Sequence, residues 1–231
     1  MQVELFNVEL GVDLERAGIV TSAESPDSRE ALLRFMRRER DTLRGAFPVF
    51  LGGEHAITSW IVEELEIGDA GFVWLDAHAD LRESYEGDPQ SHACAARNIL
   101  PYGPIVEVGV RSMSREEHEF IEASDQVSVF RRWGVDAKAA IRALPERVYL
   151  SIDFDAFDPS VIRALGTPEP GGLSWDEMLS VLDLVFEEKR VVAMDAVELC
   201  PSPHDEASSF AAARTVCEAV ARYIRKEGTD A

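Results

Sequence analysis

Three apolar segments of this chain each end in a short cluster that contains acidic or histidine residues. The segments are FPVFLGGEH at 47–55, GFVWLDAHAD at 71–80 and VYLSIDFD at 148–155. Runs rich in Val, Leu, Phe and Trp are typical of strands that are buried on both faces of a parallel sheet. The carboxyl ends of parallel strands meet along one edge, and open α/β sheets bind their ligands there. The pattern therefore predicts an α/β fold with a functional site at that edge.

Strand-like and helix-like segments alternate along the rest of the chain. This alternation predicts a three-layer sandwich, with a mostly parallel sheet and helices on both faces. The sequence has no internal repeat or low-complexity linker, so we expect one domain over residues 1–231. Strands are expected at 3–8, 47–52, 71–76, 105–110, 127–130, 147–153 and 191–198, helices at 26–44, 57–65, 135–143 and 206–226, two more helices beginning at Ser114 and Ser174, and loops at 81–90 and 167–172.

The three clusters would bring carboxylates and imidazoles together at the sheet edge. Side chains two residues apart on an extended strand point the same way, so Asp76, His78 and Asp80 would share a face. One Asp-x-His alone is more often a hydrogen-bonded strand end than a metal site, but three clusters in one chain favour metal binding. So much buried negative charge is costly unless cations neutralise it. Mainly oxygen donors suit a hard divalent cation such as Mn²⁺, and six or more donors fit two ions about 3.5–4 Å apart.

The chain carries 43 acidic and 23 basic residues, a net charge of −20. This charge argues against nucleic acid or an anionic membrane as a partner, because both bind basic surfaces. No segment approaches the roughly 20 apolar residues that cross a bilayer, and the N-terminus lacks the pattern of a signal peptide. Three irregularly spaced cysteines indicate reduced thiols, so a cytoplasmic protein is expected. The acidity indicates either a strongly hydrated surface or adaptation to a salt-rich cytoplasm.

Three motifs resemble those of the ureohydrolase family, which includes arginases and agmatinases. They are Gly-Gly-Glu-His at 52–55, Asp-Ala-His-Ala-Asp at 76–80 and Ser-Ile-Asp-Phe-Asp-Ala-Phe-Asp-Pro at 151–159. The resemblance implies an arginase-like fold and two Mn²⁺ ions per chain, with Asp76 and Asp153 as bridges. Asp158 belongs to the third motif but is not a family ligand, and before a proline it fits a turn. By this similarity one ion would be held by His55, Asp76, Asp80 and Asp153, and the other by Asp76, His78, Asp153 and Asp155.

Two further segments resemble catalytic parts of the same family. Ser-His-Ala-Cys at 91–94 is similar to the segment whose histidine shuttles protons at the mouth of the site, which implies that role for His92. Met-Asp-Ala-Val-Glu at 194–198 is similar to the strand whose glutamate binds the guanidinium, which implies that role for Glu198. A carboxylate can form two parallel hydrogen bonds with a guanidinium, and a histidine can protonate a leaving amine at neutral pH. The likeness also implies that Asp80 orients the attacking water.

The resemblance implies an amidinohydrolase that cleaves a small cationic guanidino compound into urea and an amine. The runs at 166–173 and 91–94 are more similar to agmatinases, notably archaeal ones, than to arginases. Agmatine is therefore the expected substrate, with putrescine as the amine and a place in polyamine biosynthesis. An acidic mouth that contains Glu83, Glu86 and Asp88 would suit this cation. The alternative within the family is an arginase, or a ureohydrolase of another guanidino or formimino substrate.

The family pattern begins with a further strand and a Gly-rich loop before the part that VELFNV at 3–8 resembles, which implies either a fold shortened at the N-terminus or a sequence that starts inside a longer frame. This leaves open a non-catalytic, metal-binding subunit that assembles with a full-length relative. A zinc-dependent deacetylase is an alternative from another class, but its paired histidines have no counterpart here. Ureohydrolases are typically trimers or hexamers. A homo-oligomer is therefore expected, since another subunit would cover a sheet edge that the shortened fold leaves open.

Overall fold

The computed structural model describes residues 4–22, 24 and 26–228. Its main feature is a six-stranded sheet in which all neighbouring strands are parallel, in the order β3-β8-β7-β4-β5-β6. The strands are β3 (Val49–Leu51), β4 (Gly71–Leu75), β5 (Ile105–Val108), β6 (Val127–Phe130), β7 (Arg147–Asp153) and β8 (Arg190–Val197). The helices are α1 (Arg29–Arg38), α2 (Arg40–Arg44), α3 (Ile57–Leu65), α4 (Ala95–Ile99), α5 (Arg115–Ala123), α6 (Val135–Ala143), α7 (Trp175–Glu188) and α8 (Glu206–Glu227).

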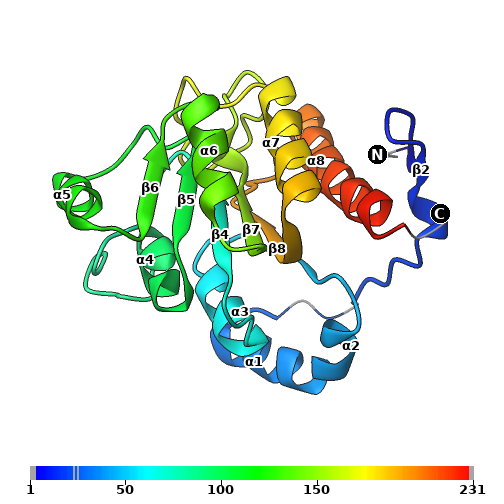
Figure 1. Ribbon diagram of the computed structural model, residues 1–231, viewed down its shortest axis with the longest axis horizontal. Helices are drawn as coiled ribbons and strands as arrows, with labels where there is room; N and C mark the ends of the chain where they lie inside the picture. Colours follow the sequence, from blue (N-terminus) through cyan, green and yellow to red (C-terminus); the bar gives the residue numbers. More distant parts are fainter. Residues whose placement is uncertain (1–3, 23, 25, 229–231) are drawn as a thin grey trace.

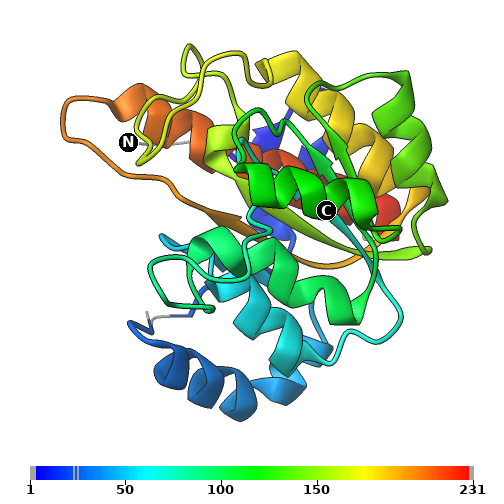
Figure 2. The same ribbon diagram turned by 90° about the vertical axis from the view of Figure 1, so that its left-hand side faces the viewer.

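Successive side chains of the central strands enter two separate cores, one on each face of the sheet. In β4, Val73 and Leu75 belong to a core that also contains residues of α6, α7 and α8, whereas Phe72 and Trp74 belong to a core with residues of α1, α3 and α4. In Figure 2 the blue and cyan helices lie on one side of the sheet and the yellow and red helices on the other. Because both faces are covered, the strands can be apolar throughout. The predicted three-layer α/β sandwich is confirmed.

Capping serines determine where two of the helices begin. Ser174 Oγ accepts a hydrogen bond from the Glu177 N–H, and the Glu177 side chain accepts one from the Ser174 N–H. Ser114 and Glu117 form the same reciprocal pair at the start of α5. These contacts satisfy N–H groups that have no partner inside a helix. The helices predicted to begin at these serines are confirmed.

The strand expected at 3–8 is found only in part and outside the main sheet. β1 (Phe6–Asn7) pairs antiparallel with β2 (Val12–Asp13) in a small separate sheet, which lies beside the end of α8 in Figure 1. Val12 and Leu14 pack against Ala221 and Ile224 of α8. The apolar side of this hairpin is therefore buried by a helix and not by the main sheet. Residue 3 of the expected strand lies outside the described residues.

One expected helix needs correction, and one helix of the structure was not expected. The helix expected at 26–44 begins at Arg29 and is divided into α1 and α2 at Glu39, whose φ of −92° and ψ of 11° leave the helical range. Helix α4 was not expected.

No described helix is long and apolar enough to span a membrane.

Candidate metal centre

The carboxyl ends of β3, β8, β7 and β4 meet at one edge of the sheet, because these strands are neighbours in that order. His55 follows the end of β3, Asp76 directly follows β4, and Asp153 is the last residue of β7. Asp155 lies in the 3₁₀ turn after β7, and Glu198 directly follows β8. The predicted site residues therefore come from segments that are remote in sequence and adjacent in space.

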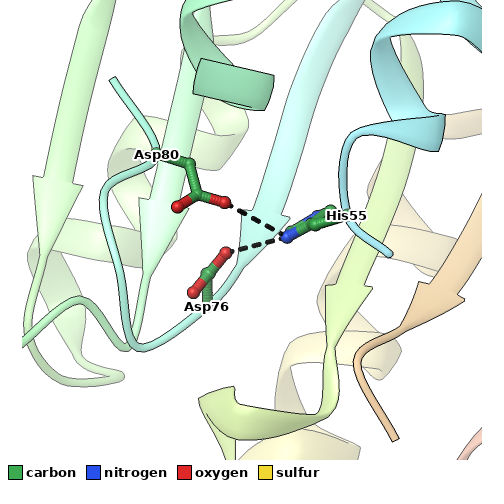
Figure 3. A group of neighbouring side chains, drawn as sticks. All are labelled: His55, Asp76 and Asp80. Carbon is green, nitrogen blue, oxygen red and sulfur yellow. Dashed lines mark ion pairs between the residues drawn. The ribbon is translucent and has the colours of Figure 1, made fainter. Parts of the chain in front are cut away.

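One half of the cluster surrounds Nδ1 of His55. This atom lies 3.1 Å from Oδ2 of Asp76, 3.3 Å from Oδ2 of Asp80 and 3.2 Å from Oδ2 of Asp153. Figure 3 shows Asp76 and Asp80 pointing towards the imidazole from the segment that follows β4. All four side chains are buried, yet within the described part of the chain His55 Nδ1 has no hydrogen-bond partner. A buried nitrogen without a hydrogen bond, surrounded by carboxylate oxygens, fits a metal ligand.

The other half of the cluster surrounds His78. Its Nδ1 lies 2.9 Å from Oδ2 of Asp155 and 3.6 Å from Oδ1 of Asp76. Asp76 thus turns one oxygen towards His55 and the other towards His78, and it belongs to both groups of donor atoms that could hold an ion. This is the place that the sequence predicted for a bridging ligand. The structure brings all six predicted ligands together, and their binding of metal stays a prediction.

The buried charges strongly shift one another's titration. Burial and the charge of Asp76 raise the pKa of Asp80 to about 7, and burial together with Asp76 and Asp155 raises the pKa of Asp153 well above its ordinary value. Burial opposes protonation of His78, but its contacts with Asp155 and Asp76 outweigh this and raise the pKa of His78 to about 11. In the metal-free protein, bound protons therefore neutralise part of the negative charge of these carboxylates. Divalent cations at the same place would displace these protons, as metal binding to such donors does.

The backbone after β4 does not stay extended, so Asp76, His78 and Asp80 do not share a strand face as expected. The strand ends before Asp76, and Asp80 has a φ of 50°, in the left-handed region that non-glycine residues rarely adopt. The His78 N–H donates to Asp76 Oδ1 at 2.6 Å, and the Ala77 N–H donates to Asp155 Oδ1 at 2.9 Å. The carboxylates converge because the backbone turns after β4. The hydrogen bonds that these carboxylates accept from the backbone stabilise the turn.

The side chain of Trp74 supports both His55 and Asp76. Its indole stacks on the His55 imidazole, with ring centroids 4.2 Å apart and planes 12° apart. Its Nε1–H donates to Asp76 Oδ2 at 3.0 Å. The ring plane of His55 and one oxygen of Asp76 are therefore positioned by the same buried residue.

A buried carboxylate on β8 lies behind His55. Ser151 Oγ donates to Asp195 Oδ1 at 2.7 Å and lies 2.9 Å from His55 Nε2. Thr58 and Tyr149 donate to Oδ2 of Asp195 at 2.8 Å and 2.7 Å. Burial raises the pKa of Asp195, and the nearby His55 and the three hydroxyls oppose this shift. Sequence reasoning gave these residues no role. The available signal was a polar residue inside an otherwise apolar, buried strand.

The two predicted catalytic residues outside the ligand set lie next to the cluster. Glu198 Oε1 accepts a hydrogen bond from the His55 N–H at 2.7 Å, and the φ of Glu198, 64°, is left-handed. Burial raises the pKa of Glu198. His92 Nδ1 lies 3.2 Å from Glu54 Oε1, and this contact raises the pKa of His92. The side chain of His92 is 51% exposed, so its proton can exchange with solvent.

Arg111 and Asp158 hold the loops that surround the end of β7. The Arg111 guanidinium donates to several backbone carbonyls, including that of Asp155 at 2.7 Å. Asp158 accepts hydrogen bonds from the Ser160 N–H at 2.9 Å and the Gly171 N–H at 2.7 Å. The Ser160 hydroxyl and these N–H groups lower the pKa of Asp158 to about 2. The interpretation of Asp158 as a turn residue is confirmed.

The fold and the donor set define an α/β protein with a candidate dinuclear metal site at the edge of its sheet. The Arginase family matches residues 4–221, and the chain belongs to this family.

Similar proteins agree with this assignment. An N(1)-aminopropylagmatine ureohydrolase of Thermus thermophilus is 37% identical over 100% of this chain and 81% of its own length. An agmatinase of Pyrococcus horikoshii is 38% identical over 93% of this chain and 78% of its own length. The crystal structure of the agmatine ureohydrolase of Thermoplasma volcanium is similar with a TM-score of 0.83 at 29% identity, over 99% of this chain and 81% of that one. The predicted family, fold and hydrolase class are confirmed.

Proposed function

We propose that this chain is an amidinohydrolase that removes urea from the guanidino end of agmatine and releases putrescine. The observation that carries the proposal is the pair of donor groups around His55 and His78, which share Asp76. Glu198, the predicted guanidinium-binding residue, contacts the backbone of His55 in the same place. The similarity to the agmatinase of P. horikoshii and the agmatine ureohydrolase of T. volcanium supports this choice of substrate.

Two divalent cations, Mn²⁺ in this proposal, would be held by the two donor groups. These donors are mainly carboxylates, with one imidazole in each group, and such a set favours Mn²⁺. Structural zinc is instead held by Cys and His. Bound cations would supply a Lewis acid that makes water nucleophilic at neutral pH. His55 and Asp80 would face the first cation, His78 and Asp155 the second, and Asp76 and Asp153 both.

The protein's own side chains would orient the substrate and move protons. Glu198, held by the His55 N–H, would pair with the planar guanidinium and fix its carbon. Asp80 would accept a hydrogen bond from the attacking water and so direct it. The water oxygen becomes the urea oxygen, the bond from the guanidino carbon to the chain nitrogen breaks, and that nitrogen leaves as the amine. His92, whose contact with Glu54 favours its protonated form, would supply the proton that the leaving nitrogen needs.

A second candidate substrate is N(1)-aminopropylagmatine, because the T. thermophilus relative of that activity matches the whole of this chain. Both compounds have a guanidinium at one end and an ammonium at the other, and the longer one has an additional amine. The exposed carboxylates of Glu83, Glu86 and Asp88 lie on the loop that leads to His92 and suit either cation. Relative kcat/KM values therefore decide between the two substrates.

Urea release after chelation and readdition of Mn²⁺ tests the activity. The compounds to compare are agmatine, N(1)-aminopropylagmatine, arginine and guanidinobutyrate. We expect release to depend on Mn²⁺ and to have its highest kcat/KM with agmatine. A preference for arginine would overturn the substrate, and full activity in metal-depleted protein would overturn the mechanism. Two bound ions without turnover of any of these compounds would favour the non-catalytic subunit.

The metal assignment has a matched pair of variants within one motif. Asp153→Asn removes a proposed bridging carboxylate and should lower the Mn²⁺ content below two ions per chain, as measured by elemental analysis. Asp158→Asn changes a turn carboxylate of the same motif and should leave the metal content unchanged. Two ions retained in Asp153→Asn would contradict the assignment.

We also propose that the chain is a cytoplasmic homo-oligomer, a trimer or a hexamer. Leu51 is 72% exposed on β3, which within the described sheet pairs with β8 alone, and such an edge favours a covering subunit. Three free cysteines suit a reducing compartment. The net charge of −20 opposes association at low salt, and added salt screens that repulsion. Light scattering should therefore show larger assemblies at high ionic strength, and an active monomer at both salts would contradict this expectation.

A further inference from the structure

The carboxylate behind His55 has two oxygens with different partners. Asp195 is fully buried on β8. Its Oδ2 accepts hydrogen bonds from Tyr149 of β7 and Thr58 of α3, at 2.7 Å and 2.8 Å. Its Oδ1 accepts a hydrogen bond from Ser151 at 2.7 Å, and the same Ser151 hydroxyl lies 2.9 Å from Nε2 of His55. Oδ1 is therefore linked through Ser151 to the candidate metal centre, whereas Oδ2 contacts side chains of the surrounding fold.

The Ser151 hydroxyl has a single proton, so the donor and the acceptor of each hydrogen bond between His55, Ser151 and Asp195 can be assigned. Three hydroxyls donate to Asp195, as they would to an ionised carboxylate, which can only accept, so the Ser151 proton points towards Asp195. The Ser151 oxygen then accepts from His55, which requires a proton on Nε2 of the imidazole. In a neutral imidazole the other nitrogen, Nδ1, then carries the free lone pair. Nδ1 is the atom that three predicted metal-binding carboxylates surround at 3.1 Å, 3.2 Å and 3.3 Å.

We propose that Asp195, acting through Ser151, fixes the tautomer and the orientation of His55 so that Nδ1 is available to a divalent cation. Asp195 is a positioning residue, because it acts without contacting the cation or the substrate. The inference rests on the proposed function, in which His55 is a metal ligand. Outer hydrogen-bond partners of metal-binding histidines have this effect in general, and their loss typically costs about 10–100-fold in metal affinity or activity.

Asp195→Asn tests the direction of the hydrogen bonds with almost no change in size. Tyr149 and Thr58 both donate to Oδ2, so the amide oxygen of the variant takes that place. The amide NH₂ then faces Ser151 and donates to it, and the Ser151 proton turns towards His55 Nε2. This reversal places the imidazole proton on Nδ1, where the cation binds. We expect Asp195→Asn to bind one of the two Mn²⁺ ions about 10–100-fold more weakly.

Ser151→Ala removes the link without reversing it and should also weaken binding of the same ion. Tyr149→Phe and Thr58→Val are matched controls, because each removes one hydroxyl that donates to Oδ2 of Asp195, the oxygen that does not contact Ser151. Both controls should bind two ions with the affinity of the parent in calorimetric titration with Mn²⁺. Equal weakening in the controls and in Ser151→Ala would overturn the proposal, because Asp195 would then act as a scaffold for the whole region.

The tautomer can also be read directly in the parent. Long-range proton–nitrogen correlation spectra of nitrogen-15 histidine-labelled protein, loaded with diamagnetic Cd²⁺, should show His55 with its proton on Nε2. A proton on Nδ1 would overturn the proposal, even if the substituted variants failed to fold. A parent that binds no Mn²⁺ would overturn the proposed function. A parent and a Ser151→Ala variant that bind two ions equally well would overturn this inference alone.

Discussion

Replacing Glu107 by glutamine should stabilise the protein, and the gain should grow with pH. Glu107 is fully buried on β5, opposite Trp74 of β4 and Val129 of β6. Within the described residues, neither of its carboxylate oxygens has a hydrogen-bond partner. Burial, with the nearby charges of Asp76 and Asp80, raises the pKa of Glu107 well above its ordinary value of 4.5. Glutamine has nearly the same shape and no charge to desolvate.

The size of the effect follows from proton linkage. Above pH 4.5 the unfolded chain loses the Glu107 proton, while the folded protein keeps it up to its higher folded pKa. The folded state then binds more protons than the unfolded state, so the free energy of unfolding falls as pH rises. Each pH unit in that window costs about 1.4 kcal/mol, and glutamine avoids this cost. For a chain of this length, 1 kcal/mol corresponds to about 2–4 °C in Tm.

Urea unfolding of metal-free protein, followed by circular dichroism at about pH 5 and about pH 7, measures this difference. Glu107→Gln should be close to the parent in stability at the lower pH and clearly more stable at the higher pH. Glu119→Gln on α5 is the control, because Glu119 is exposed to water in the folded protein. A stability gap that stays constant between the two pH values would refute the reasoning, since it would mean that Glu107 is already ionised in the folded protein.

Three other substitutions have defined outcomes. Ser174→Ala removes the cap of α7 and should lower the free energy of unfolding by about 1 kcal/mol in the same urea assay; an unchanged midpoint would contradict the capping role. Arg222→Met removes the guanidinium 2.6 Å from the buried carboxylate of Glu218, which keeps its contacts with Arg214 and Asn7, and should cost about 2 kcal/mol, visible as a lower Tm. His92→Ala should lower kcat for urea release by about 10²–10⁴-fold with the Mn²⁺ content unchanged, and a loss of bound metal would contradict a role in proton transfer alone.

Local signals predicted most of the fold. The apolar run of β7 and the helical patterns of α3 and α6 gave the bounds 147–153, 57–65 and 135–143, which the structure reproduces. Helix α4 gave no such signal, because five residues are too few to show a period. It is stabilised by tertiary contacts, since Ala95, Ala96 and Ile99 are buried in a core.

The candidate site was predictable in its residues and less so in its geometry. Motif spacing placed Asp76 and His78 at a strand end, but it could not show that the chain turns there with Asp80 in a left-handed conformation. The contact between Asp195 and Ser151 joins positions 44 residues apart. Neither residue belongs to a local pattern that identifies its partner, because only the pairing of β7 with β8 brings them together.

The strand order makes this site the last part of the sheet to be completed during synthesis. β3 leaves the ribosome early, but its neighbour in the sheet is β8, and the bond between the His55 N–H and Glu198 spans 143 positions. Pairing across such a separation is slow, because a long loop must close before any contact forms. Until Asp195 has emerged, the nascent chain carries the carboxylates after β4 without the residue proposed to orient His55. If Asp195 orients His55 as proposed, the donor groups reach their full affinity for cations only after β8 has paired with β7, so tight metal binding would follow completion of the sheet.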